Sequence, residues 1–73
     1  MDVSYRQIKA FVEVAKSSTF AEAAVSLHLT QPALSSAIKK MEEQLGGKLF
    51  QRNTRNVSLT PEGEVLFPNA VRL

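Results

Sequence analysis

Four helix-start signals divide this chain of 73 residues and constrain its fold more than any other feature. Ser4 and Thr19 are each followed three residues later by Gln or Glu, which is the pattern of a capping box. Thr30 and Thr60 each precede a proline in the first helical turn, where the missing N–H of proline does no harm. The signals predict four helices, each beginning at the residue after its cap.

Apolar residues recur at helical spacing after the first three signals, so each of these helices has one buried stripe. The first helix is predicted to end at about Lys16 and the third at Leu45, where Gly46 or Gly47 supplies a left-handed C-cap. The stripes contain Tyr5, Ile8, Phe11, Val12, Ala15, then Phe20, Ala23, Ala24, Leu27, then Leu34, Ala37, Ile38, Met41 and Leu45. A chain of this length buries only about 60% of its surface, so the shared core is thin.

The pattern changes between residues 49 and 59, where two apolar segments flank a polar one. Leu49 and Phe50, then Val57 and Leu59 alternating with Ser58, predict a two-stranded ribbon with a turn around residues 53–56. The predicted fold is therefore mainly α: a three-helix core, a two-stranded β wing and a last helix. This is the order of a winged helix-turn-helix domain.

The composition argues against several classes of function. The chain has no cysteine and a single histidine, His28, so no metal or other cofactor is expected. No apolar run approaches the ~20 residues that span a bilayer, and the N-terminus lacks the order of a signal peptide, which predicts a cytoplasmic protein without membrane contact. No nucleophile–base motif and no glycine-rich phosphate loop occur, so an enzyme is not expected.

The third predicted helix carries poor helix formers on its outer side, toward its N-terminal end. At about 100° per residue, the residues that lie away from the core are Pro32, Ser35, Ser36 and Lys39. Gln31 can offer a paired donor and acceptor to adenine, and serine hydroxyls can bond base edges or phosphates. Because an α-helix fits the major groove, this end of the helix is a candidate DNA-reading surface.

The predicted ribbon is basic, with Lys48, Arg52 and Arg55 and no acidic residue. Arg52 and Arg55 lie near its tip, where arginine can reach phosphates or enter a narrow minor groove. Glu42 and Glu43 occupy the distal half of the third helix, where DNA would repel them. We therefore expect the N-terminal half of that helix to enter the groove.

Each of these features also has a purely structural explanation. Exposed serine and glutamine are usually only solvated, and Pro32 is a good first-turn residue in any helix. Basic residues on a hairpin can simply discourage edge-to-edge pairing, and His28 in its turn is structural or merely exposed. The alternative function is a winged-helix module that binds protein and not DNA, through the apolar side of its last helix.

The run "FVEVAKSSTFAEAAVSLHLTQPALSSAIKKMEEQLGGKLFQRNTRNVSLTPEGE" resembles the N-terminal DNA-binding domain of the LysR-type transcriptional regulators. The similarity extends from Tyr5 to Leu73. Its most specific parts are "AA" at 23 and 24, "TQPALS" at 30–35, "I..ME..LG..LF.R" from 38 to 52, and "LTPEG" at 59–63. All four occur in order and at the family's spacings.

The resemblance implies a winged helix-turn-helix domain over residues 1–60 and the beginning of a dimerising linker helix over 61–73. The recognition helix would be residues 31–45 and the wing residues 51–57. Such a regulator binds double-stranded DNA with an inverted repeat as a homodimer, with higher oligomers in the full-length protein. A small-molecule effector would bind only through a C-terminal domain that this chain lacks.

The resemblance also assigns roles to individual residues. The expected DNA contacts are Thr30, Gln31, Pro32, Ser35, Ser36, Lys39, Arg52 and Arg55. The expected dimerisation residues are Val65, Leu66, Ala70 and Leu73. The family commonly has a long side chain at position 36, so the contact of Ser36 would be weaker or would come from Lys39 or Lys40. The wing also lacks the usual glycine, and Asn53 or Asn56 would take its left-handed conformation.

Overall fold

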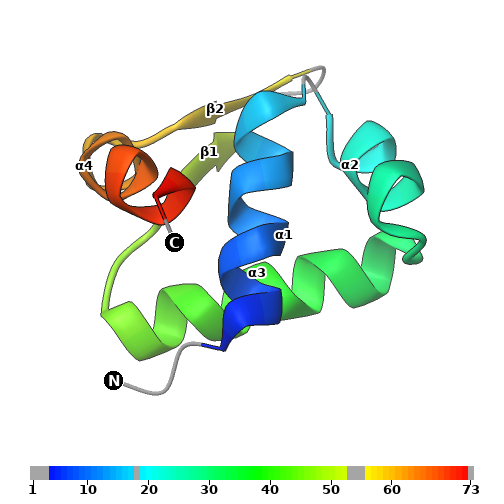
Figure 1. Ribbon diagram of the computed structural model, residues 1–73, viewed down its shortest axis with the longest axis horizontal. Helices are drawn as coiled ribbons and strands as arrows, with labels where there is room; N and C mark the ends of the chain where they lie inside the picture. The colour runs from blue at the N-terminus through cyan, green and yellow to red at the C-terminus, as the bar shows by residue number, and fades with distance from the viewer. Residues whose placement is uncertain (1–3, 18, 53–55, 73) are drawn as a thin grey trace.

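The computed structural model describes residues 4–17, 19–52 and 56–72, and Figure 1 shows how their elements are arranged. The elements in chain order are α1 (Tyr5–Lys16), α2 (Phe20–Leu27), α3 (Gln31–Leu45), β1 (Phe50–Arg52), β2 (Val57–Leu59) and α4 (Pro61–Val71). Each of the four helices begins at the residue after its predicted cap. The predicted fold class, a three-helix core with a two-stranded wing and a following helix, is confirmed.

The caps act through hydrogen bonds that span three residues. The Ser4 hydroxyl accepts from the Gln7 N–H at 3.2 Å, and the Gln7 carbonyl oxygen Oε1 accepts from the Ser4 N–H at 2.7 Å. Thr19 and Thr30 each accept one backbone N–H in the same way. Thr60 does more, since its buried hydroxyl accepts from Gly63 and donates to the carbonyl of Lys48 at 2.6 Å. The last cap therefore also joins α4 to the segment before β1.

The core lies where α1 crosses α3, with α2 on one side and the sheet and α4 on the other (Figure 1). Phe11 of α1 is fully buried, and its ring centroid lies 5.4 Å from that of Phe50 and 6.3 Å from that of Phe67. Phe20 packs edge-on against Phe50 at 6.1 Å. Two of these contacts have the favoured edge-on geometry and the third is tilted, and together the rings form one cluster that connects four elements of the fold.

The wing is antiparallel, and its register pairs Phe50 with Leu59, Gln51 with Ser58 and Arg52 with Val57. Leu49 and Phe50 are buried, which places the root of the wing against the helical core. The predicted turn falls largely on residues 53–55, which lie outside the described residues.

The apolar side of α4 faces the domain more than we expected. Ala70 is only 6% exposed and belongs to the core, and Leu66 and Phe67 pack against it. α4 lies against α1 and buries Ala70 within its own domain, and the expected role of Ala70 in dimerisation stays a prediction. Val65 is 72% exposed, and Leu73 lies outside the described residues. No helix in the described ranges is both long enough and apolar enough to cross a membrane.

The turn between α2 and α3 depends on His28, which has the left-handed backbone conformation (φ 59°, ψ 41°). Its N–H bonds the carbonyls of Ala24 and Val25, and the Leu29 N–H bonds Ala24 at 2.9 Å. This is the closure that usually has glycine at the left-handed position. At the end of α3 glycine does supply it, since Gly46 has φ 78°, and the predicted C-cap there is confirmed.

Replacing His28 with glycine should therefore stabilise the domain by about 0.5–1 kcal/mol, because the left-handed conformation is strained for a residue with a Cβ. Urea unfolding followed by circular dichroism measures the change. Ser26→Gly, in the last turn of α2 two residues earlier, should instead destabilise the domain, by up to about 1 kcal/mol. Equal destabilisation by both substitutions would show that the His28 side chain has contacts that outweigh its backbone strain.

Candidate nucleic-acid interface

The outer face of α3 carries the residues that the sequence proposed for base reading. Gln31, Pro32, Ser36 and Lys39 are exposed, as predicted, and Ser35 is half-buried. Thr30 is exposed as well, with its hydroxyl accepting the Ala33 N–H at 3.2 Å. The first half of α3 thus presents short polar side chains to the outside, with no acidic side chain among its residues.

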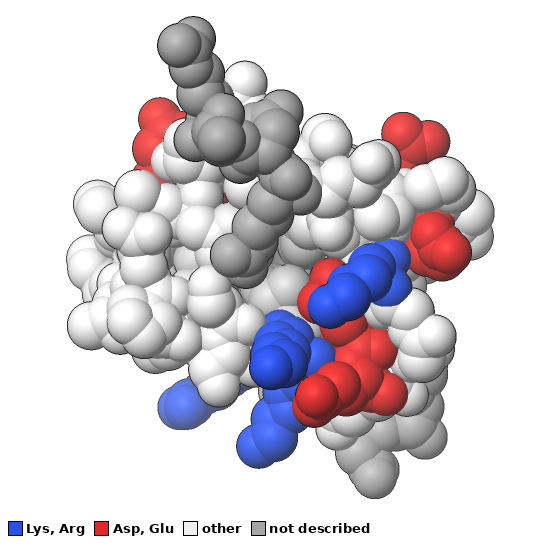
Figure 2. Space-filling view, turned by 180° about the vertical axis from the view of Figure 1, so that it is seen from behind, with Lys and Arg blue, Asp and Glu red and all other residues white. Residues whose placement is uncertain are grey.

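Figure 2 shows the molecule from behind, which brings this face into view. Charged side chains gather in one part of it. Basic and acidic side chains lie next to one another there, and basic ones extend toward the lower edge of the view. A broad surface beside them, over α2 and the beginning of α3, carries little charge. The polar half of α3 is therefore flanked by charge without being highly charged itself.

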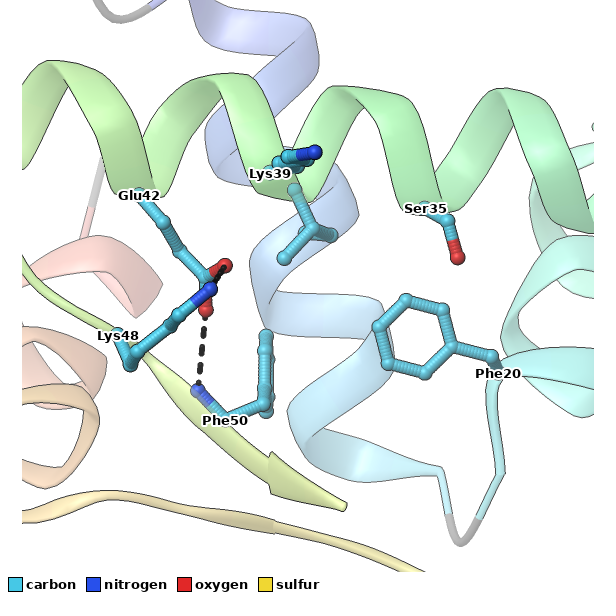
Figure 3. Close-up of a pocket in the computed structure, with 7 residues that line it drawn as sticks. Phe20, Ser35, Lys39, Glu42, Lys48 and Phe50 are labelled. Atoms are coloured by element: carbon cyan, nitrogen blue, oxygen red, sulfur yellow. Dashed lines mark hydrogen bonds and ion pairs between the residues drawn. The ribbon is translucent and has the colours of Figure 1, made fainter.

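A groove of about 500 Å³ separates α3 from the root of the wing (Figure 3). We call it the wing-side groove. Ser35, Lys39 and Glu42 line it from α3, Lys48 from the segment before β1, Phe50 from β1, and Phe20 from the beginning of α2. Its apolar base belongs to the aromatic cluster, while the lysines and the serine lie at its wall.

Glu42 has a structural role that sequence reasoning missed. Its side chain is only 11% exposed, and its carboxylate oxygen Oε2 accepts from the N–H groups of Leu49 at 2.8 Å and Phe50 at 3.4 Å. Lys48 Nζ lies 3.9 Å from the other oxygen, and since that lysine is 76% exposed the ion pair contributes little. Glu42 therefore attaches the wing to α3. The sequence had suggested only that this acid lies in the half of the helix that does not enter a DNA groove. A glutamate eight residues before the start of β1 was the available signal.

The predicted contacts of the wing are only partly within the described residues. Arg52 is the last residue of β1, opposite Val57, and nothing is described of its side chain. Arg55, predicted at the minor groove, lies outside the described residues. The remaining basic residue of the wing, Lys48, lies at the wing-side groove and not at the tip.

A three-helix core with an exposed polar third helix and a two-stranded wing defines the class of winged helix-turn-helix domains. Within this class the family is settled by comparison with known proteins. The family model described as "Bacterial regulatory helix-turn-helix protein, lysR family" matches residues 5–64. The chain belongs to this family.

Two curated relatives have the names of HTH-type transcriptional regulators. Over 66 residues the chain is 54% identical to the uncharacterized HTH-type transcriptional regulator YbhD of Escherichia coli K12, covering 90% of the chain and 21% of the relative. It is 48% identical to the HTH-type transcriptional regulator HdfR of Yersinia enterocolitica, covering 90% and 22%. The chain therefore spans about a fifth of the length of these relatives.

Solved structures share the fold closely. The oxidized form of Corynebacterium glutamicum OxyR has a TM-score of 0.95 at 39% identity, covering 99% of this chain and 23% of that one. The CbnR DNA-binding domain in its DNA complex has a TM-score of 0.91 at 35% identity, covering 94% and 79%. The BenM DNA-binding domain with catB site 1 DNA has a TM-score of 0.90 at 38% identity, covering 94% and 77%.

Proposed function

We propose that this chain binds double-stranded DNA sequence-specifically, as the DNA-binding domain of a bacterial LysR-type transcription regulator. The observation that carries the proposal is the exposed N-terminal half of α3, where short polar side chains stand beside a wing attached through Glu42. The similar CbnR and BenM domains, whose structures contain DNA, support it. A DNA-binding regulator acts where the bacterial chromosome lies, so the proposed location is the cytoplasm.

In the proposed complex, α3 enters the major groove with its N-terminal end foremost. Gln31 pairs with an adenine edge through its amide, and Ser35 and Ser36 bond base edges or phosphates at close approach. The positive end of the α3 dipole adds attraction for phosphate near Thr30 and Pro32. Lys39 contacts the phosphate backbone of the DNA beside the wing-side groove.

The wing completes the proposed contacts with one strand of the DNA. Arg52 and Arg55 reach phosphates or the minor groove, where the potential is more negative in narrow segments. Because Glu42 holds the root of the wing to α3, the distance between the two reading elements is set within one domain.

We further propose that the protein acts as a homodimer on an inverted repeat, with residues 61–73 beginning the linker helix that pairs two subunits. Val65, which is 72% exposed on α4, and the half-buried Leu66 next to it are the residues that we propose for this pairing. Two recognition helices related by a two-fold axis fit half-sites about one helical turn apart. Higher oligomers and a small-molecule effector site would belong to the longer protein.

DNA affinity should fall steeply with salt concentration, because each phosphate contact releases counterions from the duplex. The logarithm of the association constant should decrease linearly with the logarithm of salt concentration, with a slope of about −0.9 for each contact. Fluorescence anisotropy with a labelled duplex between about 50 and 200 mM salt measures this slope. Affinity that does not depend on salt would contradict DNA binding by this surface.

Replacing Gln31 with alanine should weaken binding to a selected site by about 1–3 kcal/mol, because the amide would no longer pair with its base. The site is obtained by selecting bound fragments from a random DNA pool. Asn69→Ala, which removes an exposed amide that donates to the Val65 carbonyl at 3.2 Å within α4, is the control. Equal weakening on selected and scrambled DNA would show that Gln31 contacts only the backbone.

A further inference from the structure

A second groove of about 590 Å³ runs along α3 on the side opposite to the wing-side groove. We call it the α1-side groove. At about 100° per residue, its α3 residues Ala33, Ala37 and Lys40 lie roughly half a turn around the helix from Ser35 and Glu42. The exposed face of α3 therefore has one groove on each flank.

The α1-side groove is held in shape by the beginning of α1. The Gln7 amide accepts from the Ser4 N–H at 2.7 Å and donates to the Gln44 side-chain oxygen at 3.0 Å, across to α3. One side chain thus caps α1 and joins it to the distal half of α3. Arg6, next to Gln7, is consequently placed along the same groove as Lys40.

The two grooves differ in charge. In the wing-side groove the carboxylate of Glu42 lies 3.9 Å from Lys48 and offsets its charge. Arg6 and Lys40 are both exposed in the α1-side groove, and none of the described residues that line it is acidic. Ser36 adds a hydroxyl at the edge shared with the outer face of α3. Two cations with a hydroxyl and no acid are the chemistry that recognises phosphate.

We propose that Arg6 and Lys40 bind phosphates of the DNA strand that borders the major groove on the side away from the wing. The inference rests on the proposed DNA binding of α3. A helix of about 10–12 Å diameter fills a major groove about 12 Å wide, so both of its flanks meet a phosphate backbone. The wing contacts the phosphate backbone on one flank of the major groove, and Arg6 and Lys40 of the α1-side groove contact the backbone on the other. The short Ser36 leaves this groove open where a long side chain would fill it.

The test compares the salt dependence of Arg6→Gln/Lys40→Gln with that of the unchanged chain, using two mixed-sequence duplexes of unrelated sequence. Loss of two phosphate contacts should make the slope shallower by about 1.8 and weaken binding on the order of 10- to 60-fold at about 0.1 M salt. Both duplexes should be affected equally, because phosphate contacts carry no sequence information. Arg6→Lys/Lys40→Arg should keep the original slope, since it keeps both charges.

Lys9→Gln is the matched control, because Lys9 is an exposed cation of α1 on the side that faces Ala70 and Val71 of α4. It should leave the slope unchanged. A steep slope that the double variant does not alter, or that Lys9→Gln alters to the same degree for each charge removed, would overturn the inference and leave DNA binding by α3 intact. A flat slope for the unchanged chain would instead remove the proposed function, and this inference with it.

Discussion

Ser36→Glu should abolish DNA binding, with at least a 100-fold loss of affinity on selected and scrambled duplexes alike. Ser36 is exposed on the outer face of α3 and borders the α1-side groove, so a carboxylate there would meet phosphates or electronegative base edges. Like charges brought together at an interface cost several kcal/mol, and about 2.7 kcal/mol already corresponds to 100-fold. Fluorescence anisotropy at fixed salt measures the loss.

Two further variants distinguish a negative charge at position 36 from a change in net charge elsewhere and from the loss of the hydroxyl. Lys9→Gln lowers the net charge by the same one unit on the side of α1 facing α4, and it should weaken binding only slightly. Ser36→Ala removes the hydroxyl without adding charge and should cost no more than one hydrogen bond, about 1 kcal/mol. DNA binding that survives Ser36→Glu would instead show that the outer face of α3 around position 36 does not lie against the DNA.

Gly63→Ala should destabilise the domain by about 3 kcal/mol, which lowers the melting temperature by roughly 12–24 °C for a domain of this size. Gly63 is buried in the first turn of α4, and a Cβ there would overlap the backbone carbonyl oxygen of Leu49 and lie 2.9 Å from Leu59 Cδ2. That carbonyl accepts the Thr60 N–H at 3.0 Å, so it cannot move without breaking the junction between the wing and α4. Thermal unfolding followed by circular dichroism measures the shift.

Gly47→Ala provides the matched control for this prediction. Among the described residues, the one side chain within 4 Å of an added Cβ at Gly47 would be Glu62, at 3.9 Å, which is an ordinary contact. Its effect should stay within about 0.5 kcal/mol, as for most surface substitutions. If both glycines tolerated alanine equally, α4 would not be held against the wing as closely as Gly63 indicates.

Gly63→Ala and Ser36→Glu should also differ in their effects on DNA binding. Gly63→Ala acts on the junction that connects the wing to α4, so any surviving folded protein should bind DNA with a displaced wing. Ser36→Glu changes a side chain at the surface and should leave the melting temperature nearly unchanged. Measuring stability and affinity for both variants therefore separates loss of fold from loss of interface.

Local rules account for most of the fold that the sequence predicted correctly. The cap of each helix acts on an N–H three residues away, and the end of α3 depends on a single glycine with positive φ. Such interactions are complete within about one helical turn, so the sequence predicts them without knowledge of the packing. The exposed residues on the outer face of α3 follow from the same periodicity.

The left-handed conformation of His28 was not predicted from the sequence. A left-handed C-cap without glycine has no strong sequence signal, because a residue with a Cβ seldom takes this conformation.

The sequence by itself determined the element order, the caps and the polar outer face of α3, because these depend on neighbours a few residues apart. Only the tertiary structure decided that Glu42 holds the wing, that Ala70 belongs to the core and that Arg6 shares a groove with Lys40. The physical reason is distance along the chain. Residues 34 positions apart, like Arg6 and Lys40, come together only when α1 crosses α3, and no local pattern records that crossing.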